Sequence, residues 1–232
     1  MAKRTYRRKK AQPTGSGSVS GGWTFPGALE VNVGALRDAL DLIEPAIPKK
    51  SNLPVLTYVR VGEGKVIGMD FEVGVMVAVT GLDAGPVLLP FAEAQEFLKY
   101  VPYTATARIY GSGGNLIIEA GASRVVFNGV DPADYPPVTP TLQPEHETAV
   151  DGDALVRALE EVRPYTAKEE SRPVLTCVCL TLGEEPMAVA ADGFRLGFER
   201  VRGRLPGEGN LLIPRKAVDV LSHLWAKAPK PP

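Results

Sequence analysis

The sequence has two cysteines, two histidines and no long apolar run, and each shortage excludes a class of protein. Cys177 and Cys179 would project from the same face of an extended strand with no loop to close, so they provide neither a disulfide framework nor a zinc cage. No stretch reaches the roughly 18 apolar residues that a membrane-spanning helix needs, and no signal-peptide core follows the charged start. We therefore expect a soluble cytoplasmic protein with no membrane partner.

Groups arranged for catalysis are also missing. His146 lies in an acidic segment and His223 on the last predicted helix, and neither has a partner motif that would make it a general base. The run Gly111 to Gly114 lacks the lysine and the following helix of a phosphate loop, and it predicts a hairpin turn. For Cys177 and Cys179, core packing is favoured over redox chemistry. We expect a protein that is not an enzyme, with no cofactor and no metal.

What is present suits a folded protein with a separate basic tail. The chain has 232 residues, and 44% of them are hydrophobic, which is enough for a sizeable core. The formal net charge is -1, yet the first ten residues hold six basic side chains and no acid. Without those six, 20 basic residues face 27 acidic ones, so most of the surface would repel phosphate and any contact with DNA must be local. Residues 1–22 combine this cluster with a Gly/Ser-rich run and are expected to form a disordered tail, which could itself touch DNA or RNA.

An internal repeat is the most informative feature of the sequence. Ordered matches at nearly constant spacing favour duplication, with small loop insertions explaining the drift of the offset from 119 through 122 to 124. The matching pairs are Ala35–Pro45 with Ala154–Pro164, Pro54–Leu56 with Pro173–Leu175, Met69–Phe71 with Ala191–Gly193, and Leu88–Pro90 with Leu212–Pro214.

Each repeat is predicted to begin with a strand and a helix. Leu29, Val31 and Val33 alternate as in a strand, and Leu36, Leu40 and Ile43 then recur at helical spacing until Pro45. A second helix is predicted to start at Pro90 and to end before Pro102. Short strands are expected at 55–61, 73–80, 87–89, 107–110, 115–120 and 123–128. The unit is therefore α+β, with two helices on one side of the strands.

The second copy is shorter than the first. Pro232 corresponds to position 108 of the first copy, which runs to about Thr139, so about 31 residues of the second copy have no counterpart. A sheet edge and part of a core would then be uncovered, which a native domain rarely tolerates. Either another chain completes this copy or the sequence is a fragment.

Six segments together resemble the bacterial beta sliding clamp, the beta subunit of the replicative DNA polymerase. They are Pro48–Leu56, Met69–Val73, Val130–Pro137, Ser171–Leu175, Val189–Leu196 and Ile213–Lys216. The resemblance implies the DNA clamp fold: repeated α+β domains in a head-to-tail ring, with helices lining a hole for duplex DNA and antiparallel sheets outside. Clamps have three such domains and close as a dimer. This sequence matches a first domain at 23–140 and a C-terminally truncated second domain at 141–232, so dimeric ring closure is in doubt.

A clamp holds DNA by topology, so its inner surface needs diffuse positive charge and no reading of base edges. Lys50 has the best support, because the resemblance places a DNA-contacting basic residue in the loop after the first helix. A solvated helix face remains the alternative for each single residue. The candidates on helices or their following loops are Arg37, Lys49, Lys50, Lys99, Arg157, Arg163, Lys168, Arg215, Lys216 and Lys227.

The resemblance also implies a pocket for short peptide motifs of the polymerase, the clamp loader and repair proteins. Such a pocket binds through a few apolar anchors. Ala191 replaces the usual threonine, and the other wall would come from beyond Pro232. A simple strand, glycine turn and strand is the alternative. The residues concerned are Leu175, Ala191, Gly193, Phe194, Arg195 and Leu196.

Two functions follow from these observations. The first is a sliding clamp and processivity factor that encircles duplex DNA, docks replication proteins, forms a homo-oligomer if complete, and associates with the nucleoid. The second is a clamp-derived interaction module that binds proteins, or DNA through its tail, without encircling anything.

Overall fold

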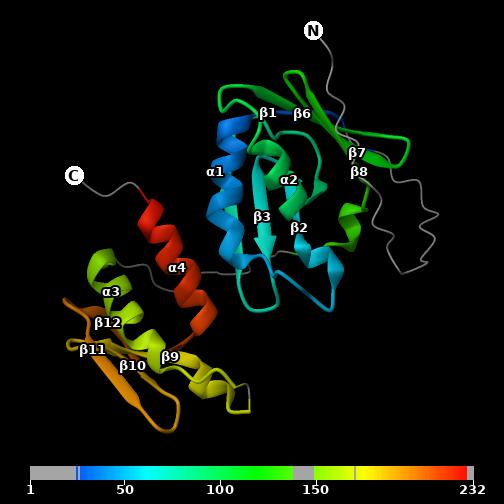
Figure 1. Ribbon diagram of the computed structural model, residues 1–232. Coiled ribbons are helices and arrows are strands. Elements are labelled where there is room, and N and C mark those ends of the chain that lie inside the picture. Colours follow the sequence, from blue (N-terminus) through cyan, green and yellow to red (C-terminus); the bar gives the residue numbers. More distant parts are fainter. Residues whose placement is uncertain (1–24, 26, 138–148, 170, 229–232) are drawn as a thin grey trace.

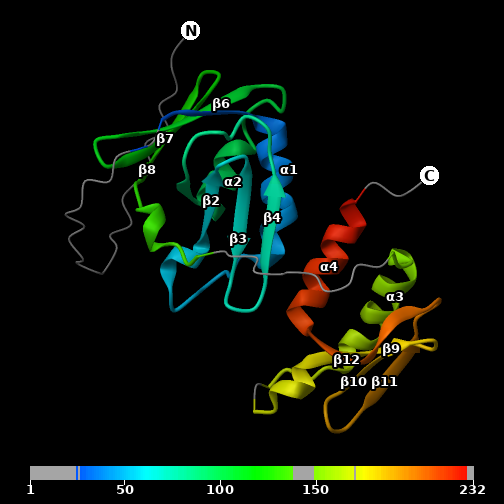
Figure 2. The same ribbon diagram turned by 180° about the vertical axis from the view of Figure 1, so that it is seen from behind.

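The computed structural model describes residues 25, 27–137, 149–169 and 171–228. The predicted tail at 1–22 and His146 lie outside these residues. Within them the chain forms two units joined at a helix, and helices lie against one side of the sheets in each (Figures 1 and 2). No helix in the described ranges is long and apolar enough to cross a bilayer.

The first unit contains two antiparallel four-stranded sheets, with orders β1-β6-β7-β8 and β4-β3-β2-β5. Helices α1 and α2 contact each other and pack on the sheets. The elements are β1 (Leu29–Asn32), α1 (Val33–Ile43), β2 (Tyr58–Gly62), β3 (Lys65–Met69), β4 (Gly74–Ala78), β5 (Val87–Pro90), α2 (Phe91–Leu98), β6 (Thr106–Ser112), β7 (Asn115–Ala120) and β8 (Ser123–Asn128).

The second unit has one antiparallel sheet of order β11-β10-β9-β12, which corresponds to the β4-β3-β2-β5 sheet. The described residues contain no counterpart of the β1-β6-β7-β8 sheet. The elements are α3 (Gly152–Val162), β9 (Cys177–Gly183), β10 (Met187–Ala191), β11 (Leu196–Arg200), β12 (Leu205–Pro214) and α4 (Arg215–Lys227).

Strand register repeats between the two units at the offsets found in the sequence. Tyr58 pairs with Pro90 in the first unit, and Cys177 pairs with Pro214 in the second. Likewise Met69 pairs with Gly74, and Ala191 pairs with Leu196. A one-residue slip would turn each apolar set to the opposite face, so this agreement shows that the same residues of each copy face the helices.

The two leading helices begin in the same way. The Asn32 side chain accepts a hydrogen bond from the Ala35 amide at 3.1 Å, and Asp151 accepts one from the Ala154 amide at 3.0 Å. Each cap satisfies an amide that has no partner within the helix. Pro45 and Pro164 then stand in short 3-10 helices, η1 (Glu44–Ala46) and η4 (Arg163–Tyr165), where the α-helices end.

Local structure departs from the sequence prediction at three places. Val33 begins α1 instead of ending a strand, because the cap at Asn32 starts the helix one residue earlier. The segment Pro54–Thr57 forms a 3-10 helix, η2, so the strand starts only at Tyr58. Cys177 and Cys179 are half-buried on the face of the sheet away from the helices, so the prediction that they pack in the core was wrong. The predicted hairpin at Gly111–Gly114 is confirmed, with φ of 59° at Gly113 and 76° at Gly114.

Helix α4 contributes to both hydrophobic cores. Val218 is 0% exposed and packs with the second core, together with Val178 and Leu159. Val220 is 4% exposed and belongs to the first core, and Leu224 packs against it. One helix of the second unit therefore joins the two units directly.

Candidate nucleic-acid and protein-binding surfaces

Four of the predicted basic residues are exposed on the surface. Lys49 and Lys50 are exposed in the loop after η1, Arg157 is exposed on α3, and Lys168 is exposed after η4. In the described part of the chain none of these four forms an ion pair. They remain available to a phosphate backbone.

The other predicted basic residues have partners inside the molecule. Arg37, on α1, stacks over the Tyr103 ring at 5.7 Å. Arg163 forms an ion pair with Asp219 of α4, and Lys216 forms one with Asp70 of the first unit. Lys227 pairs with Asp41, and Lys99 pairs with Glu96 at 3.4 Å. For the four residues in ion pairs, attraction to DNA would compete with attraction to the carboxylates.

One hollow brings three of the predicted basic residues together at the junction of the two units. Lys168, Arg215 and Lys216 line it, and so do the carboxylates Glu72 and Asp219. Arg215 Nη1 lies 3.4 Å from Thr166 Oγ1, to which it donates. The mixed lining leaves this hollow less positive than its cations alone would make it.

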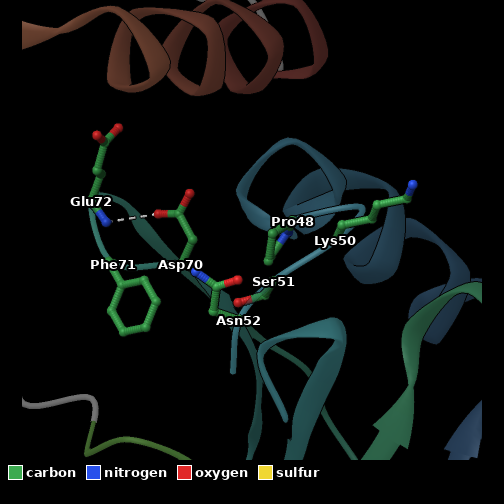
Figure 3. A pocket seen from close by; sticks show the side chains of 7 residues that line it. All are labelled: Pro48, Lys50, Ser51, Asn52, Asp70, Phe71 and Glu72. Carbon is green, nitrogen blue, oxygen red and sulfur yellow. Dashed lines mark hydrogen bonds between the residues drawn. The ribbon is translucent and has the colours of Figure 1, made fainter. Parts of the chain in front are cut away.

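A second hollow contains Lys50 and the turn between β3 and β4 (Figure 3). Asp70 accepts hydrogen bonds from the amides of Glu72 and Val73, each at 2.8 Å. Burial alone would raise the pKa of Asp70, but the Lys216 ammonium and these amides hold it below the usual value. The Phe71 ring is 75% exposed at the tip of this turn.

The six predicted pocket residues lie at one end of the sheet of the second unit. Phe194 is 97% exposed on a turn whose amides at Phe194 and Arg195 donate to Asp192 Oδ1 at 3.0 and 2.8 Å. These hydrogen bonds lower the pKa of Asp192, so the turn is held by an ionised carboxylate. Gly193 has φ of 91°, a conformation that favours glycine. The turn thus presents an aromatic ring to solvent on a fixed backbone.

The remaining pocket residues surround this turn. Arg195 lies over the Tyr165 ring at 5.7 Å, and its guanidinium donates to the Pro164 carbonyl at 3.3 Å. Leu196 is 61% exposed and pairs across the sheet with half-buried Ala191. Leu175 is half-buried, and its carbonyl accepts from the Ala167 amide at 2.8 Å. Ala191, the turn and Leu196 therefore follow one another at this end of the sheet, and Leu175 lies in the 3-10 helix Pro173–Thr176 that precedes β9.

Sequence reasoning missed the polar residues that join the two units. His223 Nε2 forms a hydrogen bond of 2.7 Å with the Asp41 carbonyl, and Asp41 also pairs with Lys227. Asp70 holds Lys216 from the other side of the junction. Since these partners are separated by 146 to 186 residues, no local pattern could have indicated them. In the described ranges no group of three or more His, Cys, Asp or Glu could hold a metal ion.

Comparison with known proteins relates this fold to sliding clamps. No family model matches the sequence. The Beta sliding clamp of Bacillus subtilis is 25% identical over 207 residues, covering 82% of this chain and 54% of the relative. The Beta sliding clamp homolog GriR of Streptomyces muensis is 23% identical over 200 residues, covering 82% of this chain and 53% of the relative. The chain thus spans about half the length of the curated relatives it matches.

A solved structure shows the same fold. The DnaN sliding clamp of Pseudomonas aeruginosa, bound to griselimycin, superposes with a TM-score of 0.74 and 22% identity over 88% of this chain and 57% of that one. The predicted α+β clamp fold is confirmed. The resemblance to the beta subunit of DNA polymerase III is confirmed as well, for part of a clamp.

Proposed function

We propose that this chain serves in DNA replication as a sliding clamp, a non-catalytic processivity factor that encircles duplex DNA and docks the polymerase and other replication proteins. The observation that carries the proposal is the repeated register, Tyr58 with Pro90 and Cys177 with Pro214, in a chain that is similar to sliding clamps over 82% of its length. Because the chain spans about half of these relatives, ring closure requires surfaces beyond those described here.

The free cations support contact with duplex DNA. Lys49, Lys50, Arg157 and Lys168 are exposed on helices or their following loops and would approach phosphates without reading bases. Arg37, Arg163, Arg215 and Lys216 would add to this field, but their internal partners reduce their contribution. We expect the charge of the surface as a whole to matter more than any single residue.

The exposed turn supports docking of partner proteins. Phe194 and Leu196 offer apolar surface at this turn, which suits a short peptide with an apolar anchor. Partners of this kind would include the polymerase catalytic subunit, the clamp loader and repair proteins, and their binding would localise the protein to the nucleoid. The basic N-terminal tail would add nonspecific attraction to nucleic acid.

Binding to circular DNA tests encirclement. A closed ring resists salt on circular DNA, because topology does not depend on counterion release, and it slides off when the circle is cut. We expect the protein, loaded on a nicked plasmid by its clamp loader, to survive a salt wash and to be lost on linearisation. Equal salt sensitivity on both DNA forms contradicts encirclement and favours the second function, an interaction module that binds without closing a ring.

A further inference from the structure

The turn between β3 and β4 in the first unit carries an exposed aromatic ring, as the Phe194 turn does in the second. Asp70 holds this turn, because its carboxylate accepts from the amides of Glu72 and Val73 and its own amide donates to the Val73 carbonyl at 3.0 Å. Phe71 is 75% exposed within the turn, so its ring stands in solvent on a fixed backbone. A ring held in this way loses little conformational entropy when it binds a ligand.

The hollow beside Phe71 differs from the surroundings of the Phe194 turn, because it is polar apart from this ring and one proline (Figure 3). Its other lining residues are Pro48, Lys50, Ser51, Asn52, Asp70 and Glu72. The anchor residue of a peptide needs apolar walls, and this hollow lacks them. A ligand with a flat apolar face and polar edges fits it better.

A nucleotide has this combination of surfaces. Its base would stack on the Phe71 ring, and the polar edge of the base would bond to the exposed Asn52 amide, which has no hydrogen-bond partner in the described residues. Lys50 is exposed and would meet the phosphate. The hollow has a volume of about 470 Å³, which is in the usual range for ligand sites.

The two carboxylates of the hollow do not prevent a phosphate from binding. Asp70 already forms an ion pair with Lys216. The Glu72 carboxylate points away from the turn on the side opposite to the Phe71 ring (Figure 3). Lys49, next to Lys50, is exposed as well. Three lysines therefore face two carboxylates, which leaves the site one positive charge.

We propose that the hollow beside Phe71 binds an unpaired nucleotide of single-stranded DNA, with Phe71 stacked on the base, Asn52 bonded to its edge and Lys50 on the phosphate. Duplex DNA offers Lys50 its phosphates but cannot use the ring, because neighbouring bases cover both faces of each base. Stacking discriminates little between bases, since every base has a π-face. A surface with both kinds of contact favours the place where duplex gives way to a single strand.

This inference rests on the proposed function in one respect, the contact between Lys50 and DNA, and it adds a second form of DNA as ligand. Binding of a short single strand requires neither a closed ring nor a clamp loader. Failure of the protein to stay on circular DNA would therefore leave the Phe71 site untouched, and failure of single-strand binding would leave encirclement untouched.

The first test measures the affinity of the 232-residue protein for a labelled oligonucleotide of eight thymidines by fluorescence anisotropy. The measurement uses about 0.3 M salt, which screens the attraction of the basic N-terminal tail. Phe71→Ala should weaken binding about 5- to 100-fold, the effect of losing one stacked base. Binding of a duplex of the same length should be unchanged by this substitution.

Phe198→Ala is the matched control. Phe198 is 64% exposed on β11 of the second unit, so the substitution removes the same ring at a similar exposure and away from the hollow. This variant should bind the single strand as the unaltered protein does. Equal affinities of Phe71→Ala and Phe198→Ala would overturn the proposal, and so would an equal loss of duplex binding in Phe71→Ala.

Photocrosslinking gives a second readout that locates the base. One thymine of the oligonucleotide is replaced by 5-iodouracil, which couples to an aromatic ring stacked on it when irradiated, and the attachment site is mapped by mass spectrometry. We expect the crosslink at Phe71, and its loss in Phe71→Ala. Crosslinks found only elsewhere in the chain would contradict the proposal and leave the hollow to a protein partner.

Discussion

Gly34, in the first turn of α1, leaves room for the aromatic ring of Tyr103. A Cβ at Gly34 would lie 2.3 Å from Tyr103 Cε1, and the Tyr103 hydroxyl donates to Asp38 from the other end. We predict that Gly34→Ala lowers the free energy of unfolding by about 1–3 kcal/mol, the usual cost of overpacking, despite alanine's better helix propensity. Urea denaturation measures the loss.

The phenol supplies a second readout for the same variant. The hydrogen bond to Asp38 raises the pKa of Tyr103. If Gly34→Ala displaces the ring, this pKa should fall toward the ordinary value of tyrosine. Gly74→Ala is the control, because a Cβ there would meet Met69 Cβ at an ordinary 3.5 Å. An unchanged denaturation midpoint and an unchanged titration for Gly34→Ala would contradict this account.

A similar arrangement in the second unit uses different positions. A Cβ at Gly152 would lie 2.1 Å from Trp225 Cη2, and Trp225 Nε1 donates to Asp153 Oδ1 at 2.7 Å. The aromatic residue belongs to α4 here but follows α2 in the first unit. Since neither the glycines nor the aromatic residues align at the repeat offset, the sequence could not predict this contact.

At the scale of elements, α4 is predicted to hold the two units together. Val220 is 4% exposed in the first core, where an unpaired carboxylate would be strongly destabilising. Val220→Asp should therefore separate the units and raise the radius of gyration measured by small-angle X-ray scattering. Ala226→Asp places the same charge on an exposed position of α4 and should leave the radius unchanged. Equal radii for the two variants would mean that α4 does not carry the junction.

Several elements were predictable because their signals are local. Strands β7 and β8 have the predicted bounds, since alternating side chains and glycine turns at Gly113 and Gly121 mark both ends. The Phe194 turn was also predictable, because an aspartate followed by glycine favours a turn. The 3-10 helix at Pro54 was not, because the apolar run after it reads equally well as a strand. The ion pairs of Lys216 and Arg163 depend on tertiary contacts, so no local pattern in the sequence predicted them.

At the scale of the whole molecule, the ion pair between Asp70 and Lys216 makes the junction sensitive to acid. The pKa of Asp70 is below its ordinary value of 3.8, so this carboxylate stabilises the folded state above that pH. The contribution is lost as the pH falls through the lowered pKa. We predict that the units separate more readily below about pH 4, which scattering measured from pH 7 to pH 3 would detect.

Asp70→Asn removes the titrating group and is the comparison for this prediction. The variant should show a weaker junction at pH 7 and a smaller change between pH 7 and pH 3 than the unaltered protein. Asp83→Asn, exposed in the loop between β4 and β5 and in neither hollow, is the control and should behave as the unaltered protein does. If Asp70→Asn keeps the full pH dependence, other carboxylates govern the junction.

The sharing of α4 has a mechanical consequence. Val218 and Val220 are two residues apart on one rigid helix, yet each is seated in a different core. The angle between the units is therefore set by side-chain packing, and it cannot change unless one of these side chains leaves its core. Packed cores respond in steps and resist gradual deformation. The curvature of an assembly built from such units would depend on the orientation of this helix. The assembly would resist bending until the helix shifted in one of the two cores.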